Sequence, residues 1–151
     1  MISKLILIWY QFTCMTFTKQ EETALIIVTA LATSPDRHMS LSDVAVRHNL
    51  PLPFLKKIAR LLKSNNIVMS KEGIGGGYQL AQSPEAISVF SVLSAVGGKT
   101  LDDGSFGGVS RVCPIGPNCI PQKIRSLITA NLISYLSAVT IDQFLKKGRT
   151  I

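Results

Sequence analysis

Residues 40–80 decide the fold, and their sequence is SLSDVAVRHNLPLPFLKKIARLLKSNNIVMSKEGIGGGYQL. A short helix begins at Ser40 or Ser42, since a serine hydroxyl can accept a hydrogen bond from the free backbone N–H groups of a first turn. Pro53 suits the first turn of a second helix, because a proline at that place loses no hydrogen bond. This second helix extends over residues 54–65, with apolar residues at helical spacing on one side and cations on the other.

A glycine-rich hairpin follows the second helix directly. Residues 67–70 and 78–80 have the composition of two short strands, and residues 71–77, KEGIGGG, form the tip between them. Nucleotide-phosphate loops run from a strand into a helix, so glycines that join two strands exclude that kind of site. Two helices joined by a turn and followed by a hairpin predict a winged helix-turn-helix. The expected fold class is mainly α with a small β-hairpin wing.

Further helices are predicted on both sides of this unit. Residues 21–33 and 88–96 carry apolar residues at helical spacing, and residues 121–139 form a long helix that is apolar on most sides. One small domain can hardly bury the apolar surface of a helix that is apolar on most sides. We therefore expect the long helix to pack both against the first helix and against a partner helix, most simply from a second copy. A short last turn at residues 140–142 and a solvated basic tail from Lys146 are expected to follow.

The charge distribution favours a DNA-binding role. The net charge is +7 with a pI near 9.6, and every charged residue between Asp43 and Glu72 is a cation. Cations gathered in this way release counterions when they meet the phosphates of a duplex. A winged helix that binds protein would carry acids or exposed apolar residues in their place. The alternatives are a solvated basic face and a wing that touches no DNA.

Two groups of residues have different expected partners on DNA. The first residues of a recognition helix face base edges, where lysine pairs with guanine and phenylalanine packs on a thymine methyl. Cations further along the helix and on the wing reach phosphates. The base-edge group is Pro53, Phe54, Lys56 and Lys57, and the phosphate group is Arg60, Lys63 and Lys71. The full set of candidate DNA-binding residues is Ser42, Pro53, Phe54, Lys56, Lys57, Arg60, Lys63, Lys71, Gly75, Gly76, Gly77 and Tyr78.

The cysteines Cys14, Cys113 and Cys119 are too few for a secreted disulfide framework and fit a reducing cytosol. Five residues separate Cys113 from Cys119, whereas zinc knuckles usually use two to four. Iron–sulfur ligation and a redox disulfide both stay open, although two cysteines cannot complete a four-ligand site. A thiol or metal-dependent enzyme is disfavoured, because no Cys-x-x-Cys motif occurs and no histidine is placed to activate a thiolate.

The N-terminal residues include a short apolar run at positions 5–10. This run has no small-x-small cleavage site after it, and it is far shorter than the roughly 20 apolar residues of a membrane span. We predict that translation starts at Met15 and that residues 1–14 are upstream sequence. An ordered extra segment and an export signal are the alternatives. The expected location is the cytoplasm, with no membrane partner.

The wing sequence GGGYQL at residues 75–80, placed after a helix-turn-helix, resembles that of the Rrf-type repressors, the group that contains IscR, NsrR and CymR. Supporting matches lie at residues 41–45, 52–58, 87–96 and 139–141, so the resemblance covers nearly the whole chain from Met15. It implies a homodimeric winged-helix regulator that is not an enzyme, with crossing C-terminal helices and a palindromic operator in double-stranded DNA. The implied domains are an extension at 1–14, the winged helix-turn-helix at 15–96, a sensor loop at 97–120, and the dimerisation helix and tail at 121–151.

The resemblance also bears on the cofactor. Iron–sulfur-sensing members of the group carry three cysteines in the sensor loop, and this chain has Gly107, Cys113 and Cys119 at those places. Glu22 stands near the acidic fourth ligand of some members, which leaves three candidate ligands here; water, His38 or His48 would have to add a fourth. The resemblance thus implies a repressor with a redox, iron–sulfur or nitric-oxide type of sensor. A [2Fe–2S] cluster and a cluster-less protein that responds to thiol oxidation or a small ligand both remain open.

Overall fold

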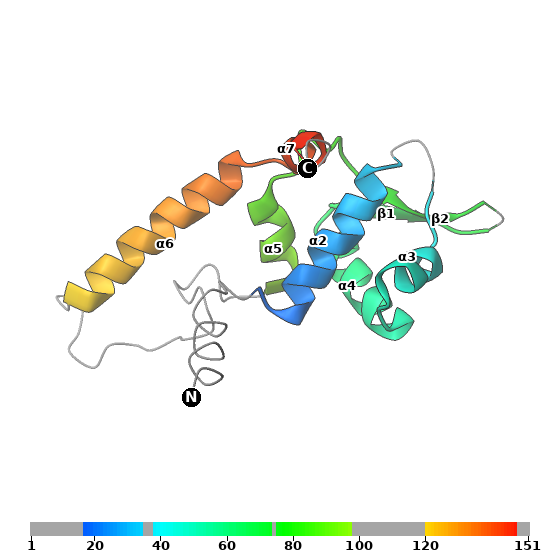
Figure 1. Ribbon diagram of the computed structural model, residues 1–151, viewed down its shortest axis with the longest axis horizontal. Coiled ribbons are helices and arrows are strands. Elements are labelled where there is room, and N and C mark those ends of the chain that lie inside the picture. The colour runs from blue at the N-terminus through cyan, green and yellow to red at the C-terminus, as the bar shows by residue number, and fades with distance from the viewer. Residues whose placement is uncertain (1–16, 35–37, 74, 98–119, 148–151) are drawn as a thin grey trace, which may run out of the picture.

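The computed structural model describes residues 17–34, 38–73, 75–97 and 120–147 (Figure 1). These residues are mostly helical and include one two-stranded antiparallel sheet, which confirms the predicted fold class. The elements are α2 (Lys19–Ala32), α3 (Leu41–His48), α4 (Leu52–Ser64), β1 (Val68–Lys71), β2 (Gly77–Leu80), α5 (Val89–Gly97), α6 (Ile120–Ala138) and α7 (Ile141–Lys147).

Local sequence sets the ends of the two central helices. The Oγ of Ser40 accepts a hydrogen bond from the backbone N–H of Ser42 at 3.1 Å, so Ser40 is the residue that caps α3. Asn49 ends α3 in the left-handed conformation, with φ of 50°. Helix α4 begins at Leu52, two residues before the predicted start, and Pro53 lies in its first turn as expected.

Helix α2 forms the centre of the core. It packs against α4, α5, α7 and β2, and its residues Ile27 and Leu31 are almost completely buried. Leu55 of α4 and Leu93 of α5 are fully buried in the same cluster. Each such side chain contributes about 1.5–3 kcal/mol through removal of apolar surface from water. One side of α4 is therefore held against the core, and its opposite side faces solvent.

The hairpin is joined to the segment that precedes α3. Strands β1 and β2 pair so that Ser70 faces Tyr78 and Lys71 faces Gly77. Met39 adds a bridge on the other side of β2, where its N–H donates to the Tyr78 carbonyl at 2.8 Å and its carbonyl accepts from the Tyr78 N–H at 2.9 Å. The wing is thus hydrogen-bonded to the start of the helix-turn-helix.

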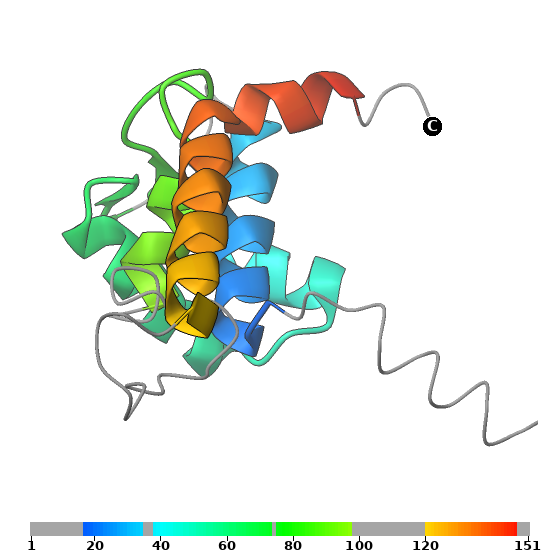
Figure 2. The same cartoon turned by 90° about the vertical axis from the view of Figure 1, so that its left-hand side faces the viewer.

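The C-terminal helices depart from the sequence expectation. Figure 2 shows α6 in front of α2 and α5; among the described elements its main contacts are with α5, while α2 packs against α7. The expected short last turn is the helix α7, whose Ile141 is 1% exposed in the core. Lys146 lies in α7, but its side chain is 75% exposed and solvated as expected, with its Nζ 2.6 Å from a carboxylate oxygen of Asp142. The helix extends further than expected because Ile141 packs into the core against α2.

Backbone hydrogen bonds fasten the junction between α6 and α7 to the start of α5. The N–H of Val89 donates to the Val139 carbonyl at 2.9 Å, and the N–H of Ile141 donates to the Ile87 carbonyl at 3.0 Å.

Within the part of the chain that the structure describes, none of the helices is both long enough and apolar enough to cross a membrane.

Candidate nucleic-acid interface

Helix α4 presents two opposite faces. Leu55, Ile58 and Leu62 are fully buried on the side of α2 and α5. The exposed side carries all four cations of the helix, which are Lys56, Lys57, Arg60 and Lys63. Because the buried stripe prevents rotation of the helix, the cations stay directed toward solvent.

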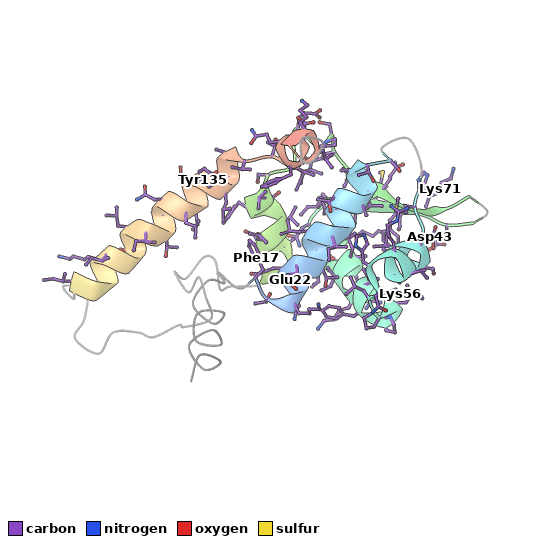
Figure 3. All side chains as sticks on the ribbon, in the orientation of Figure 1. Phe17, Glu22, Asp43, Lys56, Lys71 and Tyr135 are labelled. Atoms are coloured by element: carbon purple, nitrogen blue, oxygen red, sulfur yellow. The ribbon has the colours of Figure 1, made fainter. Side chains whose placement is uncertain are left out.

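The start of α3, the exposed side of α4 and the wing enclose a hollow of about 410 Å³. It brings together residues that are far apart in the sequence. Its lining consists of Ser40, Leu41, Ser42, Leu52, Lys56, Arg60, Lys63, Gly76, Gly77 and Tyr78. Figure 3 places Lys56 on α4 and Lys71 on the wing, both on the side of the molecule away from Tyr135 and α6.

The three cations of the hollow follow one another at one-turn spacing along α4. Lys63 donates from its Nζ to the Oγ of Ser70 in β1 at 2.6 Å, which joins the helix to the wing. Among the described residues, no carboxylate forms an ion pair with Lys56 or Arg60. Uncompensated positive charge in a concave surface concentrates the field and attracts anions.

Close backbone contacts require two of the wing glycines. A Cβ on Gly77, which has φ of +146°, would lie 2.7 Å from the carbonyl oxygen of Met39. A Cβ on Gly76 would overlap the carbonyl oxygen of Lys71. Both positions therefore need glycine for the hairpin and its attachment to form. Gly75 differs, since nothing lies within 4 Å of the place where its Cβ would be.

The hollow gathers seven of the twelve predicted DNA-binding residues. These are Ser42, Lys56, Arg60, Lys63, Gly76, Gly77 and Tyr78. Pro53, Lys57, Lys71 and Gly75 are exposed outside it. Phe54 is only half-buried and packs against the core, so part of its ring is used in folding. Sequence reasoning missed Ser40, Leu41 and Leu52; Ser40 carried a signal, but only as a helix cap.

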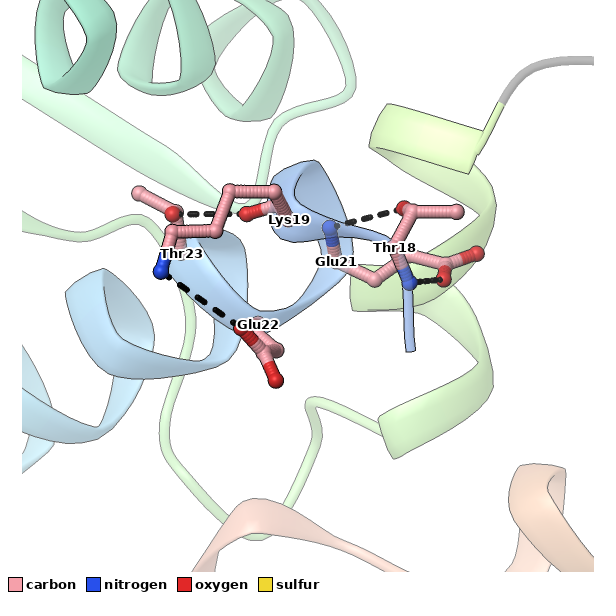
Figure 4. A network of polar contacts seen from close by, with 5 residues as sticks. All are labelled: Thr18, Lys19, Glu21, Glu22 and Thr23. Carbon is pink, nitrogen blue, oxygen red and sulfur yellow. Dashed lines mark hydrogen bonds and ion pairs between the residues drawn. The ribbon is translucent and has the colours of Figure 1, made fainter. Parts of the chain in front are cut away.

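The part of the chain that the structure describes does not bring the candidate metal ligands together. Glu22 lies in the first turn of α2 with a half-exposed carboxylate, 3.7 Å from the Nζ of Lys19 (Figure 4). Its neighbour Glu21 is instead used in a capping box, accepting from the N–H of Thr18 at 2.7 Å. Cys113 and Cys119 lie outside the described residues, within which no group of three His, Cys, Asp or Glu side chains could hold a metal.

The donor set supplies three candidates, the two thiolates and Glu22, for the four protein ligands that a [2Fe–2S] cluster takes. A fourth protein ligand would have to be His38, in the segment before α3, or His48, in α3 itself. The described residues do not by themselves gather a cluster site.

The sequence profile of the Rrf2 family, described as iron-dependent transcriptional regulators, matches residues 17–147. IscR of Yersinia enterocolitica is 28% identical over 112 residues, which cover 74% of this chain and 67% of that protein. IscR of Pectobacterium carotovorum is 28% identical over 118 residues, covering 78% of this chain and 71% of its own. Both relatives are HTH-type transcriptional regulators.

Solved structures share the fold. CymR, the global cysteine regulator of B. subtilis, superposes with a TM-score of 0.69 at 20% identity, covering 87% of this chain and 97% of its own. IscR of T. potens gives a TM-score of 0.72 at 19% identity and covers 88% of both chains. The relatives and the structural neighbours are transcriptional regulators and not enzymes. With the family profile matching almost all of the described elements, the chain belongs to the Rrf2 family of winged-helix transcriptional regulators.

Proposed function

We propose that this regulator is a homodimeric repressor that binds a palindromic site in double-stranded DNA. The observation that carries the proposal is the cationic hollow at the junction of α3, α4 and the wing, where Lys56 and Arg60 have no described acidic partner. Such a surface matches the charge of a duplex, and repression follows when the bound protein blocks access to a promoter. The proposal places the protein in the cytoplasm, where the chromosome of a bacterium lies.

In this proposal α4 is the recognition helix. Its first turn carries Pro53, which is exposed, and Lys57 follows one turn later. These residues would enter the major groove, where lysine can pair with guanine O6 and N7. The wing would approach an adjacent groove, with the exposed Lys71 and Gly75 nearest the duplex. The base-reading surface and the wing are held in one orientation by the bridge between Met39 and Tyr78.

The exposed apolar residues of α6 are the observation that supports a homodimer. Its exposed apolar residues, between 54% and 70% accessible, are Ile120, Ile124, Leu127, Ile128 and Tyr135. At 100° per residue these positions form one stripe, on the opposite side of the helix from the buried Thr129. A second copy would cover the stripe with the same stripe, because a two-fold interface joins identical surfaces. Two recognition helices would then read half-sites one helical turn apart, about 34–36 Å.

Duplex binding and its salt dependence test the proposal. A duplex selected from a random library by the wild-type protein would be titrated by fluorescence anisotropy at several salt concentrations. We expect a logarithmic affinity that falls linearly with the logarithm of salt, and a slope that the K56Q/R60Q variant reduces by about 2. Lys123→Gln, which removes an exposed cation on α6, is the matched control and should leave the slope unchanged. Absence of salt-sensitive binding in every redox state would refute the proposal.

We assign the sensing of the signal to residues 97–120, in which Cys113 and Cys119 would be the reactive groups. Because a fourth cluster ligand would have to come from water, His38 or His48, thiol chemistry or a small ligand without a cluster is the second candidate. Anaerobic purification with a visible spectrum and iron and sulfide analysis separates the two. A coloured protein with matched iron and sulfide, both lost in Cys113→Ser, would establish a cluster. A colourless, iron-free protein that still binds DNA would establish the second candidate.

A further inference from the structure

We propose that the hollow between α3, α4 and the wing seats one backbone phosphate of the duplex, held by Lys56 and Arg60. This inference rests on the proposed DNA-binding function and refines it. It moves Lys56 from the base-reading group, where its place near the start of the recognition helix had put it, to the phosphate-binding group.

The residues that line the hollow favour an anion as its ligand. Lys56 and Arg60 stand one turn apart on α4 and both line the hollow, and no described acid pairs with either. Ser40, which caps α3, and Ser42, in its first turn, add hydroxyl groups that can donate to an oxygen. Two cations without a described acidic partner, with hydroxyl donors beside them, suit the charged oxygens of a phosphate.

The geometry of the hollow is fixed before any ligand arrives. Lys63, its third cation, donates to Ser70 at 2.6 Å and so ties the end of α4 to β1. The wall formed by Gly76 and Gly77 is held by their close approach to neighbouring backbone. A site whose parts are already in place loses less conformational freedom on binding. Lys63 thus serves the hollow mainly as a positioning residue.

The location selects the duplex as the source of the phosphate. The hollow opens between the recognition helix and the wing, which are the two elements that would straddle a DNA backbone. Lys57, adjacent in sequence to Lys56, lies outside the hollow and is exposed. A phosphate in the hollow would set the depth and register of α4 and would leave Lys57 free to meet a base edge.

A methylphosphonate scan tests the inference. Each duplex, built on the sequence selected by the wild type, has one phosphate replaced by a neutral methylphosphonate. We expect one position in each half-site to cost the wild-type protein about tenfold in affinity. The same substitution should cost the K56Q/R60Q variant nothing further, since the groups that recognise the charge are already absent. Lys57→Gln should keep the full tenfold loss at that position. The K56Q/R60Q and Lys57→Gln variants change exposed side chains only, so both are expected to unfold at the same temperature as the wild type.

The outcomes separate the inference from the function on which it rests. If K56Q/R60Q still binds the duplex and loses as much as the wild type at every position, the inference is overturned and DNA binding stands. If inorganic phosphate, titrated without DNA and followed by NMR, binds only proteins that keep Lys56 and Arg60 while the scan finds no coupled position, the hollow serves a free anion and the assignment to DNA is wrong. No duplex binding by the wild type would overturn the proposed function itself.

Discussion

The Nζ of Lys63 in the last turn of α4 lies 2.6 Å from the Oγ of Ser70 in β1. Helix α4 and the wing are therefore joined by a side-chain hydrogen bond as well as by the chain. In the proposed function they would fit two neighbouring grooves of DNA, and a fixed mutual orientation would then reduce the freedom that each loses on binding.

Breaking this bond should weaken DNA binding more than it weakens the fold. Both side chains are solvent-accessible, so Ser70→Ala should change the free energy of unfolding by no more than about 0.5 kcal/mol. DNA affinity should fall several-fold, with no change in its salt dependence. Lys63→Met should lower the affinity further, because it also removes a cation from the hollow, and coupling through the bond should make the double variant lose less than the sum of the two single losses. Strictly additive losses in the anisotropy titrations would instead mean that Lys63 contacts a phosphate directly.

Gly77→Ala should destabilise the protein by more than the roughly 1–3 kcal/mol that an unfavourable backbone conformation costs alone. The added Cβ would lie 2.7 Å from the carbonyl oxygen of Met39, and the φ of +146° is one that alanine avoids. The wing would have to separate from the segment before α3. Urea unfolding measures the loss through the transition midpoint.

Gly75→Ala is the matched control for that substitution. Its φ of +75° also disfavours alanine, but the space around the new Cβ is open. It should therefore cost only about 1–2 kcal/mol from the backbone alone. If Gly75→Ala destabilises the protein as much as Gly77→Ala, contact with Met39 is not the reason for glycine at position 77.

Local signals made the helix-turn-helix and the wing predictable. The serine cap at Ser40 and the proline in the first turn of α4 act within a few residues, and the structure keeps both of them. The burial of Leu55 and Ile58 follows from their helical spacing. These features gave the order of the elements and the exposed side of α4.

Contacts between distant residues could not be predicted from the pattern. No local signal pairs Met39 with Tyr78, and the hollow exists only because that bridge brings the wing beside the start of α3. The burial of Ile141 likewise depends on α7 reaching α2 across the fold. Phe54 stands four residues before the buried Ile58, so helical spacing agrees with its packing against the core, although the sequence prediction placed it at a base edge.

Asp142 should control the titration of Lys146. The hydrogen bond and the charge of Asp142 raise the pKa of Lys146 above its ordinary value. The ion pair therefore contributes to the folded state below the ordinary lysine pKa, and its contribution disappears as the pH rises through the raised value. In Asp142→Asn, the pKa of Lys146 followed by NMR at its ε-carbon should move down toward the ordinary value. An unchanged pKa would show that the pair does not persist in solution.

The exposed stripe of α6 should hold the dimer together. Leu127 is 65% exposed and Ile128 62% exposed within one chain, so a charge at these positions should leave the monomer folded. Leu127→Glu combined with Ile128→Glu places carboxylates in the proposed two-fold interface, where unpaired charges are costly. Sedimentation equilibrium should find a dimer for the wild type and a monomer for the variant. Because one monomer reads only one half-site, the affinity for the palindromic duplex should fall by at least about tenfold.

Ser126→Glu is the control for the dimer experiment, since Ser126 is exposed on α6 but lies to the side of the apolar stripe. It should keep both the dimer and the affinity. A wild-type protein that is monomeric at the concentrations at which it binds the palindrome would contradict the role given to α6. A double-glutamate variant that stays dimeric with an unchanged far-UV circular dichroism spectrum would place the interface elsewhere on the surface.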